Sequence, residues 1–223
     1  MGALLKKDFI TSRYVYTVAI LIVGIAICVS SMYNFEGGTL MIYFLGTLIV
    51  PLMANKFTAT DEMRRNYDVI INSFPVRRID VVLSKFIYYL VSYILTSFIL
   101  LAIITIVRDF HKEELTMIYI VQSLSFIYYC LIIGVTNFIY YRYDYGDATK
   151  YSSIIIIAVI NVPIIILRLV DNINPNISVK ITNYLLESTA HGIYVATAII
   201  LLGLIIYALF VQLSMIGYMK RNL

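Results

Sequence analysis

The stretch FIYYLVSYILTSFILLAIITIV, residues 86–107, runs for 22 positions without a charged side chain. A helix needs about 20 apolar residues to cross the roughly 30 Å hydrocarbon core of a bilayer. Five further stretches are long and apolar enough to do the same, namely residues 14–33, 39–55, 116–141, 151–170 and 193–217. We therefore expect an all-α integral membrane protein whose six transmembrane helices form one transmembrane domain over residues 1–223.

The composition agrees with a chain that exposes most of its surface to lipid. Hydrophobic residues make up 61% of the sequence and charged residues only 13%, whereas the surface of a soluble domain carries about 25–35% charged residues. The net charge of +4 is too small to indicate a nucleic-acid partner. Cys28 and Cys130 lie inside apolar runs without CxxC or Cys/His spacing, so neither a disulfide nor a metal site is predicted.

Lysine and arginine are distributed unevenly between the two sides that six crossings would create. One side receives 13 of the 17 basic residues, and the other receives Arg108, Lys112, Arg168 and Lys180. Cytoplasmic loops carry the excess of basic residues in membrane proteins. We therefore expect both termini in the cytoplasm, the loop of residues 57–85 inside, and the loop of residues 171–192 outside.

The first cytoplasmic segment, LLKKDFI at residues 4–10, mixes apolar and basic side chains. Leu5 and Phe9 are four residues apart and share one helical face, while Lys6 and Lys7 can reach anionic headgroups. This pattern predicts a short helix in the inner membrane interface. A frayed basic tail that only sets the topology is the alternative.

The loop at residues 57–85, FTATDEMRRNYDVIINSFPVRRIDVVLSK, is the only predicted cytoplasmic loop long enough to hold structure of its own. It predicts a helix over residues 61–73, with Asp61 and Glu62 at its positive N-terminal end. One apolar face then repeats at helical spacing and consists of Tyr67, Ile70, Ile71 and Phe74. A face of this kind outside the membrane lies on the bilayer or docks into a groove of a partner. We favour a partner, and an interfacial helix without one is the alternative.

Pro75 opposes continuation of that helix, because it disfavours helical geometry at the preceding residue. A second helix is predicted from about Val76 through Lys85, directly into the span of residues 86–107. This continuity would transmit movement of the docked helix into the membrane. The residues assigned to this transmission are Pro75, Arg77, Arg78 and Lys85.

The segments LLKKDF and DEMRRNYDVIINSFPVRRIDVVLSK, together with six spans, resemble the ABC-2 type permeases of bacterial ATP-binding-cassette exporters. Members of the family typically carry an acidic pair, a polar turn, a small apolar helix, an element with Pro and Arg, and an element that ends in Ser-Lys and an aromatic residue. In this sequence they correspond to residues 61–62, 64–66, 69–73, 74–78 and 82–86. Where the family often has Gly in its polar turn, Tyr67 follows Asn66 here. Within the family, the short chain rich in Ile and Tyr is similar to permeases of phenol-soluble-modulin exporters.

The resemblance implies a type V exporter-like fold and a separate cytoplasmic ATPase subunit that holds ATP and Mg²⁺, with no cofactor on this chain. Residues 61–73 would be the coupling helix seated in a cleft of that ATPase, which the chain would contact through Asp61, Glu62, Arg64, Arg65, Tyr67, Ile70, Ile71 and Phe74. Two permease subunits, as a homo- or heterodimer, would enclose the route. The implied location is the bacterial cell membrane, and the implied substrates are amphipathic peptides or other hydrophobic molecules, including antimicrobial peptides.

The same residues bear on other classes of function. An enzyme is not indicated, because the sequence has no HExxH or GxSxG motif and His111 and His191 fall on or near outer loops. An ion- or proton-coupled transporter is an alternative, although the spans offer only Gln122, Asn137 and Asn161 as polar groups for such a role. A membrane immunity or regulatory protein without its own ATPase is another alternative.

Overall fold

Five long helices make up most of the structure, a computed structural model that describes residues 2–33, 36–64, 77–107, 112–142 and 189–219, with single positions between 151 and 180. The helices are α1 (Gly2–Met32), α2 (Glu36–Arg64), α4 (Arg78–Val107), α5 (Lys112–Arg142) and α8 (Thr189–Met219). Each has 29 to 31 residues, a length of about 45 Å at 1.5 Å per residue. Among the described residues, all five are long and apolar enough to cross a membrane. They correspond to five of the six predicted spans.

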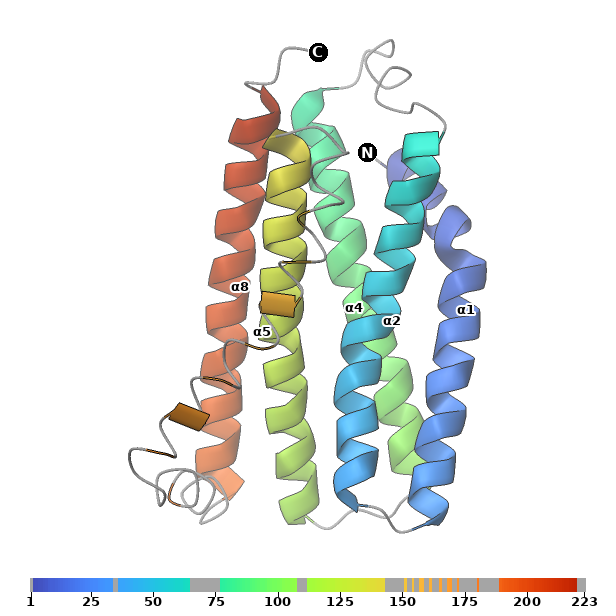
Figure 1. Cartoon of the computed structure of the whole chain (residues 1–223), viewed down its shortest axis with the longest axis vertical. Helices are drawn as coiled ribbons and strands as arrows, with labels where there is room; N and C mark the ends of the chain where they lie inside the picture. Colours follow the sequence, from blue (N-terminus) through green and yellow to red (C-terminus); the bar gives the residue numbers. More distant parts are fainter. Residues whose placement is uncertain are drawn as a thin grey trace.

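The helices stand side by side, and both termini lie at the same end of the bundle (Figure 1). We call this the N-terminal end. The last turns of α2, α5 and α8 and the first turns of α1 and α4 are located there. All five helices are longer than the hydrocarbon core requires, so their ends continue beyond it.

The predicted span of residues 151–170 lies largely outside the described residues and stays a prediction. The described positions in it, including Tyr151, Ile154 and Ile165, are helical and exposed. In the described part of the chain, α5 ends at the N-terminal end and α8 begins at the opposite end (Figure 1).

The loop predicted for residues 57–85 is much shorter in the structure. Residues 57–64 continue α2, and residues 78–85 are the first turns of α4. The predicted second helix, continuous from the loop into residues 86–107, is therefore confirmed. The predicted helix start before Asp61 is wrong, because the Thr60 hydroxyl donates backward to the carbonyl of Lys56 at 2.8 Å within an unbroken helix.

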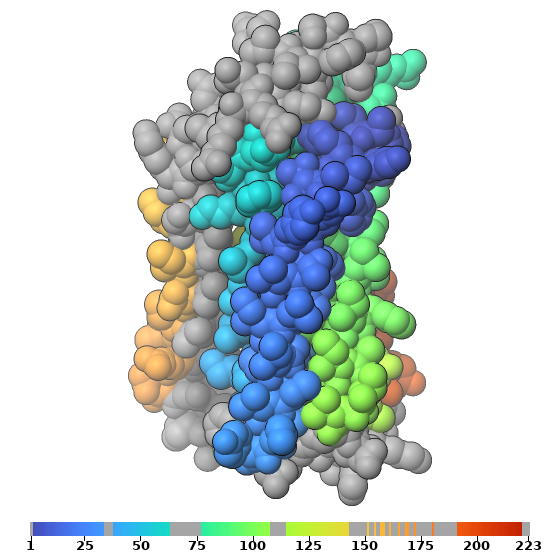
Figure 2. Space-filling model, turned by 90° about the vertical axis from the view of Figure 1, so that its right-hand side faces the viewer, coloured from blue at the N-terminus to red at the C-terminus, as the bar shows by residue number. Residues whose placement is uncertain are grey.

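The N-terminal segment also differs from the prediction. It is not a separate interfacial helix, because α1 runs unbroken from Gly2 to Met32. Its apolar side chains Leu4, Leu5 and Phe9 pack against the protein core, and the Phe9 ring meets Tyr88 edge-on at 5.0 Å between centroids. Figure 2 shows α1 along one face of the molecule, between α2 and α4. The apolar side of its first turns is therefore covered by protein and not by lipid.

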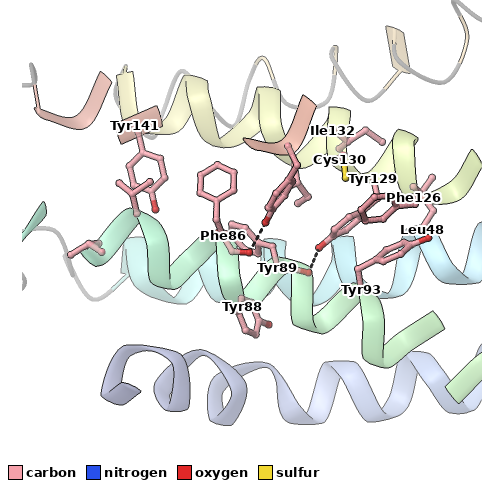
Figure 3. Close-up of a cluster of buried hydrophobic side chains, with 14 of the residues drawn as sticks. Leu48, Phe86, Tyr88, Tyr89, Tyr93, Phe126, Tyr129, Cys130, Ile132 and Tyr141 are labelled. Atoms are coloured by element: carbon pink, nitrogen blue, oxygen red, sulfur yellow. Dashed lines mark hydrogen bonds between the residues drawn. The ribbon is translucent and has the colours of Figure 1, made fainter. Parts of the chain in front are cut away.

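Aromatic side chains dominate the larger of two hydrophobic clusters (Figure 3). Tyr88, Tyr129 and Phe86 are among its fully buried members, and they come from α4 and α5. The smaller cluster centres on Ile27, Tyr43 and Leu100. The Tyr129 hydroxyl of α5 donates to the main-chain carbonyl of Tyr89 of α4 at 2.8 Å, so this core contains hydrogen bonds between helices as well as apolar packing.

Candidate functional site

Four charged side chains from three helices meet at the N-terminal end of the bundle. Lys7 and Asp8 belong to α1, Glu62 to α2 and Lys85 to α4. The Lys85 amino group lies 2.9 Å from Asp8 Oδ1 and 2.5 Å from Glu62 Oε1. Lys7 Nζ lies 3.2 Å from Asp8 Oδ1 and also binds Glu62. We call this group of four residues the ionic cluster.

The ionic cluster is largely removed from solvent. The side chain of Asp8 is fully buried, and those of Lys85 and Glu62 are only 8% and 11% exposed. Burying a single charge costs several kcal/mol unless a partner of opposite charge compensates it. Two cations and two anions make the cluster neutral, so its members are stable there only together.

One atom in the cluster is incompletely satisfied. Asp8 Oδ2 is buried and has no hydrogen-bond partner among the described residues. An unsatisfied buried acceptor costs about 1–3 kcal/mol. The ion pairs of the cluster have to offset this cost.

Local sequence explains how each helix brings its charge inward. Asp8 shares the inward face of α1 with Ser12 and Ala19, which are small enough for close helix contact. Lys85 lies on the inward face of α4, one turn before the buried Tyr88 and Tyr89. Spacing of three to four residues places these side chains on one face of each helix.

The position of Glu62 at the C-terminal end of α2 makes compensation of its negative charge necessary. Asp61 and Glu62 lie in the last turn of α2, where the helix dipole disfavours negative charge. The prediction had placed them at a helix N-terminus, where the dipole favours them. Lys7 and Lys85 compensate Glu62 in the structure, and Asp61 is half-buried beside it.

A comparison with protein families gives one match, which covers nearly the whole chain. The family model described as ABC-2 family transporter protein covers residues 3–218, and so includes all four residues of the ionic cluster. The chain belongs to the ABC-2 transporter family. No curated protein and no solved structure gives a significant match to the chain.

The family makes this chain the membrane component of an ATP-binding-cassette transporter, and ATP hydrolysis takes place on a separate subunit. The resemblance inferred from LLKKDF and the loop after the second span is therefore confirmed at the level of the family. The five apolar helices of the described part of the chain are consistent with a multi-pass membrane protein.

The predicted site residues of this ABC-2 protein are partly brought together. Lys7, Glu62 and Lys85, which had been assigned to three different roles, meet in the ionic cluster. Lys7 was predicted to face headgroups, and this is wrong for its amino group, which binds Glu62. Lys6, at the preceding position, is exposed. Asp8 was not among the predicted site residues, and its only signal in the sequence is its helical spacing from Ser12.

The remaining predicted residues lie around the start of α4 or outside the described part of the chain. Arg77 is exposed, whereas Arg78 lies over the ring of Tyr218 of α8, 5.8 Å from its centroid. Arg64 ends α2, and its side chain is not described. The predicted contacts that lie outside the described residues are Arg65, Tyr67, Ile70, Ile71, Phe74 and Pro75. Their roles stay predictions.

The polar residues considered for ion coupling make local or interhelical hydrogen bonds. The amides of Asn137 and Asn161 each donate to the carbonyl four residues earlier in the chain, at 2.8 Å. The amide of Gln122 joins α5 to side chains of α2 and α4. The contacts of Gln122 join helices in the way that polar side chains do in membranes, whereas those of the two asparagines are local.

Proposed function

We propose that this ABC-2 protein is the permease subunit of an exporter whose separate cytoplasmic ATPase docks on the connection between α2 and α4, residues 65–77. One observation supports this proposal above the others. The helices on either side of that connection are joined to each other and to α1 through the ionic cluster.

The physical consequence is that a force on the connection reaches three helices together. Glu62 lies two residues before the end of α2, and Lys85 lies seven residues after the start of α4. Separating them would leave buried charges without partners, which costs about 3–5 kcal/mol. Movement imposed by an ATPase would therefore shift α1, α2 and α4 as a unit before it separated them.

The proposed orientation places the N-terminal end of the bundle in the cytoplasm of a bacterial cell. Exposed basic side chains at that end support it, and they include Lys6, Arg13, Lys56 and Arg77. Basic residues are concentrated on the cytoplasmic side of membrane proteins. In this arrangement, ATP and Mg²⁺ bind to the partner ATPase, and a second permease subunit completes the transport route.

Co-purification with the ATP-binding-cassette ATPases of the source cell tests the docking proposal. Ile70→Asp places a charge on the predicted apolar docking face and should release the ATPase while the permease still inserts into the membrane. Ile70→Val keeps that face apolar and should retain the ATPase. Equal retention by both variants would contradict docking at this connection.

We further propose amphipathic peptides and related hydrophobic molecules, including antimicrobial peptides, as substrates. Interior aromatic rings with polar tips support this class, because the sequence contains 20 tyrosines and several are buried between helices. Side chains of this kind accommodate apolar surface and hydrogen-bonding groups together.

Uptake into inside-out vesicles that contain the permease and its ATPase tests the substrate. A fluorescent amphipathic helical peptide should accumulate when ATP is added, and a scrambled peptide of identical composition should accumulate much less. ATP-dependent uptake of neither peptide, in vesicles whose ATPase is active, would contradict the proposed substrate class.

A further inference from the structure

Two basic side chains lie on the outer face of α1 near its start. Lys6 and Arg13 are both exposed, and their separation of seven residues is almost two full turns of helix, or about 10 Å along its axis. They therefore lie on the same side of α1. Among the described residues, neither forms an ion pair, whereas the neighbouring Lys7 is bound to Glu62. This side of α1 therefore carries two positive charges that the protein itself does not compensate.

Arg13 is held at the surface by the residue that follows it. Its guanidinium group lies 4.6 Å from the centroid of the Tyr14 ring and donates a hydrogen bond of 2.8 Å to the Tyr14 hydroxyl. Tyr14 is 69% exposed, and tyrosine rings in membrane proteins are enriched at the level of the lipid headgroups. A guanidinium group has five N–H donors, and its planar fork fits the oxygens of a phosphate group. Most of these donors point to an acceptor outside the protein.

Beyond Tyr14, the exposed face of α1 becomes apolar. Val18, Leu21 and Ile25 are exposed there, and the sequence has no charged residue from position 14 to position 33. Figure 2 shows α1 along one face of the molecule. The phosphate of a phospholipid lies above its acyl chains, so a single lipid molecule matches this order of basic and then apolar side chains along the helix.

The exposed end of α8 lacks such a basic pair. This helix also ends at the N-terminal end of the bundle (Figure 1), and residues 209–219 include no charged side chain. Its exposed side chains there include Leu209, Leu213 and Ile216. The two helices therefore differ in the charge that they present at the same end of the bundle.

We propose that Lys6 and Arg13 form a binding site for an anionic phospholipid. Both side chains donate hydrogen bonds to the phosphate group, and the acyl chains lie along Leu21 and Ile25. A zwitterionic lipid offers the same phosphate, but its own cation weakens the attraction to the two basic residues. Each basic side chain near an anionic membrane surface contributes about 1 kcal/mol, which corresponds to a preference of about fivefold. The proposal depends neither on where an ATPase docks nor on which end of the bundle is cytoplasmic.

Tryptophan fluorescence tests the proposal on the full chain, because the sequence contains no tryptophan. Leu21→Trp places one reporter on α1 beyond Arg13, and Leu209→Trp places the matched reporter on α8. The two leucines are 58% and 53% exposed, and each lies about two turns inside the end of its predicted apolar run. Each variant is reconstituted into phosphatidylcholine vesicles that also contain phosphatidylglycerol or phosphatidylcholine with brominated acyl chains. Bromine quenches tryptophan at short range, so the quenching measures which lipid lies beside the reporter.

The reporter on α1 should prefer brominated phosphatidylglycerol over brominated phosphatidylcholine by about fivefold or more. The reporter on α8 should show almost no preference. Adding Lys6→Gln and Arg13→Gln to Leu21→Trp should abolish the preference, whereas Lys6→Arg with Arg13→Lys keeps both charges and should retain it. Lys56→Gln with Arg77→Gln is the matched control, because it also removes two exposed positive charges, and it should leave the preference unchanged.

Three results would overturn the proposal. The first is equal quenching of the α1 reporter by the two lipids, which would leave the basic pair to the acidic surface of a protein partner. The second is the same preference for phosphatidylglycerol at the α8 reporter, which would show that the whole perimeter attracts anionic lipid. The third is a preference that survives the loss of both Lys6 and Arg13.

Discussion

Glu62 of α2 and Lys85 of α4 are separated by 23 residues in the chain and joined by an ion pair of 2.5 Å. The pair joins the last turn of α2 to the early part of α4. It is also bound to α1, because Lys7 contacts Glu62 and Asp8 contacts Lys85. This ABC-2 protein therefore has a direct link from its first helix to both helices that border the predicted ATPase contact.

Replacing Lys85 with methionine should strongly destabilise the protein. Asp8 and Glu62 would keep their buried negative charges with only the half-buried Lys7 as partner. Removing one member of a buried ion pair costs about 3–5 kcal/mol. Thermal unfolding in detergent, followed by circular dichroism, measures the effect. Lys6→Met is the control, because Lys6 is exposed, and an equal loss in both variants would show that the buried pairing is unimportant.

Replacing the whole ionic cluster should separate stability from transport. A quadruple variant with Lys7→Met, Asp8→Leu, Glu62→Met and Lys85→Met leaves no unpaired charge, and such replacements are often neutral for stability. Its unfolding temperature should lie near that of the wild type. If the proposed function is correct, ATP-dependent peptide uptake into vesicles should nevertheless fall. Wild-type uptake by a correctly inserted quadruple variant would show that the cluster does not transmit movement.

Gly134→Ala should weaken the contact between α5 and α8, because the added methyl group would overlap the ring of Phe210. Overpacking of this kind costs about 1–3 kcal/mol. Adding Phe210→Ala should remove the overlap and make the effect of the glycine substitution smaller. Gly217→Ala on α8 is the matched control, since its nearest neighbour would lie 3.5 Å away, an ordinary contact. Thermal unfolding is compared for the wild type, Gly134→Ala, Phe210→Ala and the double variant. Additive effects of the two substitutions would contradict the contact between these residues.

Gln122→Leu should destabilise the protein by about 1–2 kcal/mol, because Gln122 makes several interhelical bonds of about 0.6 kcal/mol each on average. Its amide contacts Tyr43, Tyr93 and Ser97. Gln212→Leu makes the same chemical change on α8 at an exposed position and should be nearly neutral. Unfolding in detergent compares the two variants, and a neutral Gln122→Leu would mean that these bonds contribute little.

Labelling of single cysteines tests the membrane orientation. In a background without Cys28 and Cys130, Lys6→Cys at the N-terminal end should react with a membrane-impermeant maleimide only after the cells are opened. Met32→Cys, at the other end of α1 and 80% exposed, should react in intact cells. The opposite pattern would reverse the orientation derived from the basic residues.

The long helices could be predicted because each is encoded by a local run of apolar residues. The continuity of α4 from the loop into the membrane was predicted for the same reason, since no breaker follows Pro75. The start of a new helix at Asp61 was predicted wrongly from local capping residues. Extending an existing helix costs less than nucleating a new one, so α2 simply continued through Thr60 to Arg64.

By itself, the sequence determined the class of protein, its apolar helices, its uneven basic charge and its ABC-2 family. These properties depend on composition and on neighbours within a few turns of helix. Only the tertiary structure decided that Lys7, Asp8, Glu62 and Lys85 form one cluster, because residues up to 77 positions apart meet only after three helices have packed. The same holds for the aromatic core between α4 and α5, since helical spacing shows which residues share a face but not which helix that face contacts.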